Sequence, residues 1–128
     1  MRWTLLGVIA TPTALAAITI LALEGREVVV VRTPDGRGTR TWIADDGGAA
    51  WVEAANPERP FLRALDTRPD VDVVRGGVTH RCRATAMPNP EGHRRVRELL
   101  ARKYGWADRW IGMLADTSRS VGIRLACD

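Results

Sequence analysis

A chain of 128 residues has room for one modest hydrophobic core, and its 27% charged and 45% apolar residues exclude an intrinsically disordered protein. The formal charge of +4 comes almost entirely from scattered arginines, with Lys103 as the one lysine. Because no run of like charges and no motif of a nucleic-acid-binding fold accompanies this charge, we expect no nucleic-acid partner.

The first 25 residues form an apolar segment. No charged side chain occurs from Trp3 to Leu23, and about 20 such residues match the length of a membrane-crossing helix. Residues 1–25 are therefore predicted to be a helical membrane anchor. Two alternatives stay open: a cleaved signal peptide, for which residues 22–25 are a poor cleavage site, and a helix that packs on the domain or lies at a membrane surface.

Basic residues around this segment predict its orientation. One arginine, Arg2, precedes it, and four follow within a short distance: Arg26, Arg32, Arg37 and Arg40. Basic residues that flank a membrane anchor favour the cytoplasmic side. We therefore expect a membrane-associated protein whose globular domain, residues 26–128, faces the cytoplasm.

The first part of this domain has the pattern of a three-stranded antiparallel meander. Residues 27–33 are rich in β-branched side chains, and residues 39–44 and 50–53 continue the strand pattern. Pro34-Asp35-Gly36 and Asp45-Asp46-Gly47-Gly48 separate them and have the composition of hairpin turns.

Helices and a second hairpin are predicted in the remainder. Asn56-Pro57 and Asn89-Pro90 each have the form of a helix start, the first leading to a short helix and the second to a longer one that ends at Gly105. Three further segments are predicted: a hairpin over residues 71–86, a helical segment over 106–114 and a closing strand over 120–126. This order predicts an α+β fold in which about six antiparallel strands curl into a small barrel with covering helices.

Motifs for phosphate loops, metal sites and hydrolases are absent from the sequence. Gly36-Arg37-Gly38 lies in a predicted turn rather than before a helix, and the two histidines have no partners at metal-ligand spacing. We expect no metal site. Cys82 and Cys127 allow one disulfide, but a single distant pair is no disulfide framework, and both are predicted to be reduced core residues.

Arginines and tryptophans near the predicted turns are the remaining candidates for a site. They are Arg37, Arg40, Trp42, Arg59, Trp106, Trp110 and Arg119. Arginine binds phosphate through a rigid fork, and tryptophan offers a flat face to a ring system. Together they are suited to an aromatic, phosphorylated cofactor. The alternative is that the tryptophans belong to the core and the arginines to the surface.

Residues 27–127 contain VVRTPDGRGTRTWIADDGG, YGWADRW and SRSVGIRL. With the predicted order of elements, these phrases resemble the split β-barrel proteins related to pyridoxamine-phosphate oxidase, and most of all their deazaflavin-dependent nitroreductase branch. The resemblance implies a small antiparallel split β-barrel. It also implies a homodimer, since the cofactor of such proteins lies in the groove between two protomers.

The resemblance also implies a set of cofactor-binding residues. A Gly-x-x-Arg phrase between the first two strands holds phosphate in that branch, and a loop with Asn-Pro at a helix start borders the ring. In this sequence the corresponding residues, with the neighbouring aromatic and arginine side chains, are Arg37, Gly38, Arg40, Trp42, Arg59, Phe61 and Arg119. Trp42 and Phe61 would line the ring, and Arg119 would contact the acceptor or the cofactor tail.

The activity implied is that of a reductase that uses a deazaflavin coenzyme, or alternatively FMN, to deliver hydride to a small quinone-like or nitroaromatic acceptor. No catalytic side chain is assigned. The Trp-Tyr pair that follows Asn-Pro in that branch is missing, since Asn56-Pro57 is followed by Glu-Arg-Pro-Phe. This departure motivates the alternative, a non-catalytic split barrel without a cofactor that binds a ligand or acts as a membrane-associated partner module.

Overall fold

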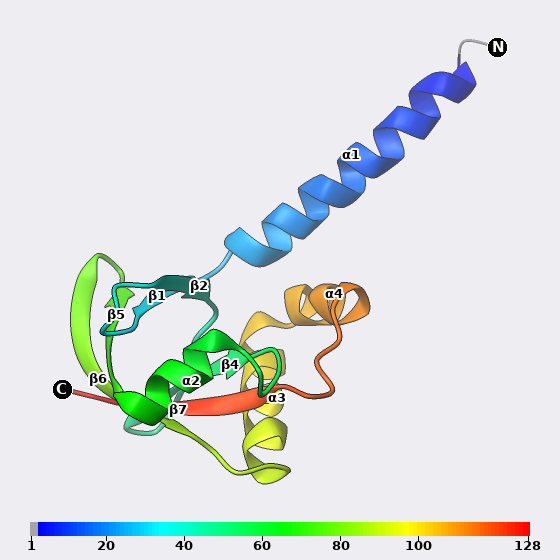
Figure 1. Cartoon of the computed structure of the whole chain (residues 1–128). Helices are drawn as coiled ribbons and strands as arrows, with labels where there is room; N and C mark the ends of the chain where they lie inside the picture. The colour runs from blue at the N-terminus through cyan, green and yellow to red at the C-terminus, as the bar shows by residue number, and fades with distance from the viewer. Residues whose placement is uncertain (1–2) are drawn as a thin grey trace.

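A computed structural model places the backbone of residues 3–128 and the side chains of residues 11–128. Over these residues the chain forms four helices and one seven-stranded sheet (Figure 1). The helices are α1 (Trp3–Glu24), α2 (Pro60–Thr67), α3 (Glu91–Tyr104) and α4 (Trp106–Leu114). The strands are β1 (Val29–Arg32), β2 (Gly38–Thr41), β3 (Ala44–Asp46), β4 (Ala49–Ala54), β5 (Asp70–Arg75), β6 (Val78–Ala86) and β7 (Val121–Cys127).

The sheet is antiparallel throughout, with the strand order β2-β1-β5-β6-β7-β4-β3. It curls into a half-barrel around a core in which Val29, Val31, Ile123 and Leu125 are almost completely buried. Valine and isoleucine pack well on a pleated surface, so the Val-rich strands supply this core. The predicted α+β class and curled antiparallel sheet are confirmed, with seven strands in place of about six.

Strands β2 and β3 lie at opposite edges of the sheet although only two residues separate them in the chain. The sequence predicted one strand over residues 39–44, but this strand is interrupted at Ile43. The N–H of Ile43 donates to the hydroxyl of Tyr104 at 3.1 Å, and that hydroxyl donates to the carbonyl of Glu27 at 2.6 Å. Lys103 Nζ donates to the Ile43 carbonyl at 2.7 Å. Side chains of α3 thus replace strand partners for this backbone.

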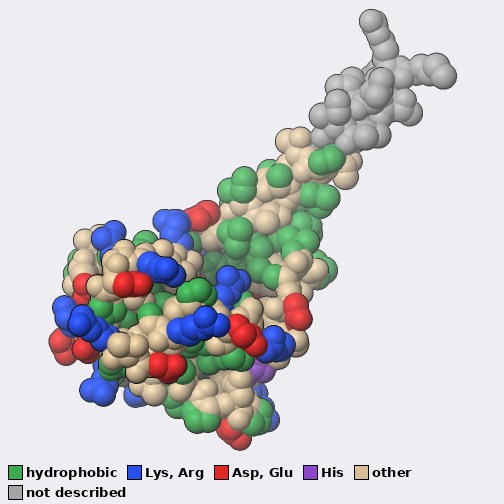
Figure 2. Space-filling view, in the orientation of Figure 1, with side chains coloured by type: hydrophobic (Ala, Val, Ile, Leu, Met, Phe, Trp, Pro, Cys, Tyr) green, Lys and Arg blue, Asp and Glu red, His purple; other side chains and the backbone are tan. Residues whose placement is uncertain are grey.

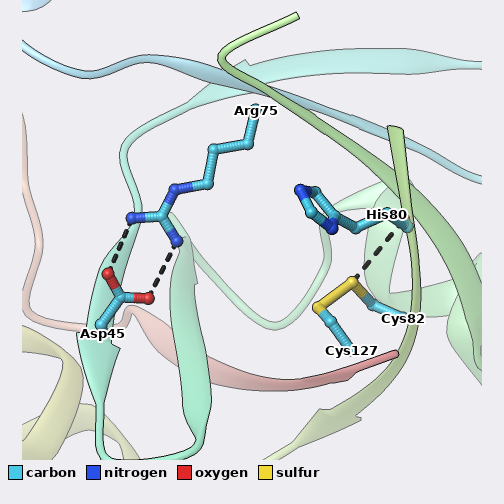
Figure 3. The surroundings of a disulfide bond; sticks show 5 residues. All are labelled: Asp45, Arg75, His80, Cys82 and Cys127. Atoms are coloured by element: carbon cyan, nitrogen blue, oxygen red, sulfur yellow. Dashed lines mark hydrogen bonds and ion pairs between the residues drawn. A yellow bond between two sulfur atoms is a disulfide. The ribbon is translucent and has the colours of Figure 1, made fainter. Parts of the chain in front are cut away.

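An arginine on β5 supports the same region. Arg75 pairs with Glu27 at 3.0 Å and with Asp45 at 2.7 Å, and Figure 3 shows the second pair. Hydrogen bonds from Arg75 are the main reason why the pKa values of both carboxyl groups lie below their usual range. The arginine therefore links β5 to β3 and to the segment that precedes β1.

Helix α3 packs closely on β7 through two glycines. A Cβ atom on Gly122 would lie 2.5 Å from the carbonyl oxygen of Gly92, so no larger residue fits without moving the helix. A second apolar cluster forms between α3 and the sheet, and it includes Trp51, Val96 and Leu100. The half-barrel is thereby covered on its outer side by α3.

Helix α1 extends away from the barrel, and its last turns contact α4 and the corner after β2 (Figure 1). Trp110 Nε1 donates to Thr19 Oγ1 at 3.0 Å, and Trp42 Nε1 donates to the carbonyl of Leu23 at 3.1 Å. Ala22 is fully buried in the cluster beneath α4. The C-terminal end of α1 is therefore part of the packed domain.

Other apolar side chains of α1 are exposed, as Figure 2 shows along the described part of the helix. Ile20 and Leu21 are 62% and 59% exposed. Among the residues that the structure places, no helix has the combination of length and apolarity that defines a membrane span. Residues 1–2 of the predicted anchor lie outside the described residues, and membrane association through residues 1–25 stays a prediction.

Cys82 and Cys127 form a disulfide (Figure 3), so the prediction of two reduced cysteines was wrong. The two residues lie directly opposite each other on β6 and β7, with Cα atoms 4.0 Å apart. Because 45 positions separate them in the sequence, their spacing contained no sign of this pairing. The register of the two strands brings the thiols together.

One predicted helix start is displaced. Asn56 does not cap a helix, because its side chain accepts a hydrogen bond from the N–H of Glu58 at 3.1 Å and forms a turn, and α2 begins at Pro60. Helix α3 begins at Glu91, next to its predicted start, and the Asn89 side chain accepts from the N–H of His93 at 3.0 Å. Both asparagines satisfy backbone donors, but only the second lies at a helix terminus.

We predict that Tyr104→Phe lowers the free energy of unfolding by about 2 kcal/mol, because the buried N–H of Ile43 loses its acceptor. The ring would still stack on Trp42, since the two ring centroids are 4.2 Å apart with planes 8° from parallel. The loss would therefore report the hydroxyl alone. Chemical denaturation of both proteins measures it, and equal stability would contradict the role of Tyr104 at this corner.

Replacing Cys82 and Cys127 together by serine is expected to lower the free energy of unfolding by about 3–4 kcal/mol. The disulfide closes a loop of about 45 residues, and removing it increases the entropy of the unfolded chain. Denaturation with and without a reductant checks this. The reductant should destabilise the wild type and leave the double variant unchanged; a wild type insensitive to reductant would show that the disulfide does not form.

Candidate functional site

A cleft of about 390 Å³ lies between the β1–β2 edge of the half-barrel and strands β4 and β7. Its volume falls within the range of about 300–1,000 Å³ that small-molecule sites occupy. The start of α2 and the turn before β2 also contribute. The cleft is lined by Val31, Arg37, Thr39, Arg40, Thr41, Val52, Glu53, Ala54, Ala55, Arg59, Pro60, Phe61 and Ile123.

Three arginines from two separate segments meet at this cleft. Arg37 lies 3.5 Å from Asp35, and Arg40 lies 2.5 Å from Glu24, and both guanidinium groups are well exposed. The side chain of Arg59 has no ion pair within the described part of the chain. Exposed ion pairs are weak and exchange readily, so all three guanidinium groups are available to an anionic ligand.

The rest of the lining is apolar and contains one aromatic ring. Val52 and Ile123 form a buried floor, and Phe61 is half-buried against the core at the start of α2. Arginine forks suit a phosphate, and an apolar surface with an aromatic face suits a fused ring. The residues present therefore fit a phosphorylated flavin-type cofactor.

The structure brings Arg37, Arg40, Arg59 and Phe61 of the predicted set together at the cleft. The other three predicted residues lie elsewhere. Gly38 begins β2 beside the cleft, opposite Arg32 on β1. Trp42 lines a neighbouring cavity, and Arg119 pairs with Glu58 at 2.5 Å, one residue before Arg59.

One charged group at the cleft was missed by the sequence analysis. Glu53 on β4 lines the cleft and pairs with Arg97 at 2.9 Å, and Arg97 pairs with Asp108 at 2.5 Å. Burial by itself would lower the pKa of Arg97, but the bond to Asp108 and the charge of Glu53 outweigh it and raise that pKa. The three residues come from β4, α3 and α4, and no local sequence pattern links them.

No protein-family model and no curated protein matches this chain. Solved structures match it over most of its length. A candidate pyridoxamine 5′-phosphate oxidase from Listeria innocua gives a TM-score of 0.56 at 16% identity, covering 85% of this chain and 90% of that one. A FAD-binding protein from Mesorhizobium loti gives 0.53 at 14% identity and 88% coverage of both chains. A candidate 5-nitroimidazole antibiotic resistance protein from Bacteroides thetaiotaomicron gives 0.54 at 10% identity, covering 86% and 76%.

These likenesses define the class of fold, which is the split half-barrel of pyridoxamine-phosphate-oxidase-like proteins. The resemblance predicted from the sequence is confirmed at this level. Because one fold supports many functions, the deazaflavin-dependent branch and the reductase activity stay predictions.

We predict that Arg97→Ala lowers the free energy of unfolding by about 2 kcal/mol, because it leaves the poorly exposed carboxylates of Glu53 and Asp108 without their shared partner. Arg102→Ala is the matched control on the same helix, since the pair of Arg102 with Glu98 is exposed and should contribute little. Urea denaturation of the three proteins measures the difference. Equal effects of the two substitutions would contradict a special role for the Arg97 group.

Proposed function

We propose that the cleft binds a phosphorylated flavin-type cofactor and that the protein is a reductase. It would use a deazaflavin or FMN to deliver hydride to a quinone-like or nitroaromatic acceptor. One observation carries this proposal: Arg37, Arg40 and Arg59 meet around an apolar cleft that also contains Phe61. The fold likeness to a FAD-binding protein and to a candidate pyridoxamine 5′-phosphate oxidase supports the same class of cofactor.

Each part of the cleft has a distinct task in this proposal. The arginines hold the phosphate through charge-assisted hydrogen bonds. Phe61 borders the ring, and the floor of Val52 and Ile123 keeps water from its inner face. The bound cofactor supplies the hydride chemistry, and the protein binds and orients it. No side chain of the cleft is required to carry out a covalent step.

A homodimer belongs to the same proposal. The Arg37 and Arg40 side chains are 71% and 61% exposed, so a phosphate bound to them would remain in contact with solvent. A second copy of the chain placed over the cleft would reduce this exposure and strengthen the charge interactions. Sedimentation equilibrium of the purified protein distinguishes a dimer from a monomer.

Membrane association through residues 1–25 is also proposed, and the exposed Ile20 and Leu21 on α1 support it. The proposed cytoplasmic side rests on the arginines that follow this segment. The disulfide between Cys82 and Cys127 argues against that side, because disulfides persist mainly in oxidising compartments. Because Cys82 and Cys127 are joined in the disulfide, the test uses Met113→Cys, which adds a thiol at a position that is 72% exposed. A membrane-impermeant maleimide added to intact cells labels this thiol only if the domain lies outside the cytoplasm.

The cofactor proposal is tested by titrating the purified protein with FMN and with riboflavin, which lacks the phosphate, while flavin fluorescence is recorded. We expect Arg40→Ala and Arg59→Ala each to weaken FMN binding about tenfold, since a hydrogen bond to a charged group contributes roughly 1.5–3 kcal/mol. Riboflavin binding should not change. A phosphorylated 5-deazaflavin titrated in parallel separates the two cofactors.

Two further variants control this experiment. Arg63→Ala removes an arginine of α2 that does not line the cleft and should leave FMN binding unchanged. Glu24→Gln should tighten FMN binding by up to about fivefold, because Glu24 competes for Arg40 in an exposed ion pair.

If Arg40→Ala binds FMN as the wild type does, the phosphate assignment is wrong. If neither flavin binds, the non-catalytic ligand-binding module is favoured instead.

A further inference from the structure

A second cavity, of about 350 Å³, lies beside the cleft, between the end of α1 and helices α3 and α4. It shares Arg40, Thr41 and Glu53 with the cleft. Molecules bound in the two places would therefore be neighbours. The proposed cofactor site makes no use of the remaining lining of this cavity, which has a chemistry of its own.

The charge of the second cavity is opposite to that of the cleft. Three carboxylates, of Glu24, Glu53 and Asp108, line it together with the two guanidinium groups of Arg40 and Arg97. The cleft has three arginines and one glutamate. Side chains of the Glu53, Arg97 and Asp108 group are 16%, 21% and 9% exposed, so solvent screens their surplus negative charge only in part. An anionic ligand is favoured in the cleft and disfavoured in the second cavity.

The apolar part of the second cavity is built for a flat molecule. Its walls include Leu23, Trp42, Leu100 and Ile111. The Trp42 indole is fixed at one face and at one edge, since its ring stacks on Tyr104 with centroids 4.2 Å apart and its Nε1 donates to the carbonyl of Leu23 at 3.1 Å. A fixed aromatic side chain beside aliphatic walls binds another ring without losing further side-chain entropy.

We propose that this cavity is a second ligand site that takes a flat, apolar molecule without an anionic group. In the reductase it is the site of the acceptor, and that role rests on the proposed function. The binding preference itself does not, because it follows from the charges and the aromatic wall of the cavity. The two sites then separate their ligands by charge: the phosphorylated molecule binds in the cleft, and the uncharged ring binds beside it.

The proposal is tested by calorimetric titration with 1,4-naphthoquinone and with 1,4-naphthoquinone-2-sulfonate, which differ in one anionic group. The two quinones are compared in the full-length protein carrying Arg37→Ala and Arg59→Ala, because these arginines line only the cleft and would otherwise bind the sulfonate there. We expect the neutral quinone to bind at least tenfold more tightly. Ile111→Trp fills the cavity from α4 and should weaken quinone binding at least tenfold. Met113→Trp on the same helix adds the same ring at a position that is 72% exposed, outside the cavity lining, and should have no effect.

A second filling variant and a flavin titration make each outcome decisive. Leu23→Trp fills the cavity from the end of α1 at a position that is already 42% exposed. It should weaken quinone binding as strongly as Ile111→Trp, and it replaces that variant in the test if Ile111→Trp folds poorly. Both variants should bind FMN as the wild type does.

Loss of quinone binding with intact FMN binding supports a separate site. Equal binding of the two quinones, or quinone binding unaffected by both variants, overturns the proposal. Quinone binding without flavin binding supports the site and removes only its role in a reductase.

Discussion

The contact between the Tyr104 hydroxyl and the backbone of Ile43 is the constraint on which the architecture depends. It occupies the N–H of Ile43 at the point where the chain leaves β2. Strand β2 then pairs with β1, and β3 pairs with β4 at the other edge of the sheet. The half-barrel stays open between these edges, and the cleft lies in that opening. The ring of the same tyrosine stacks on Trp42, which lines the second cavity. One side chain of α3 therefore helps to position parts of both cavities.

Arginine has two different tasks in this molecule. Away from the cleft it connects elements: Arg75 links β5 to β3, and Arg97 links α3 to β4 and α4. At the cleft, Arg37, Arg40 and Arg59 have exposed partners or none within the described residues. The pI of about 10 therefore reflects many local pairs together with one cluster whose charge is available to a ligand.

The candidate site was predictable where its residues belong to recognisable local patterns. Arg37 and Arg40 flank a turn between two strands, and Arg59 and Phe61 lie at a helix start, so sequence patterns and family resemblance together identified them. Trp42 was assigned to the same site but lines the neighbouring cavity, where its ring stacks on Tyr104 and its Nε1 donates to the carbonyl of Leu23. Both partners lie far from Trp42 in the sequence, so no local pattern places its ring in that cavity.

The sequence by itself determined the elements: the Val-rich strands, the turns with proline, aspartate and glycine, and helices whose apolar residues recur at helical spacing. These follow from steric and hydrophobic preferences over a few neighbouring residues. Only the tertiary structure decided the partners of Cys82, Glu53 and Arg97, and the split of one predicted strand into β2 and β3. Those outcomes require groups separated by 11–61 residues to meet at defined distances, and such distances depend on how the whole sheet curls.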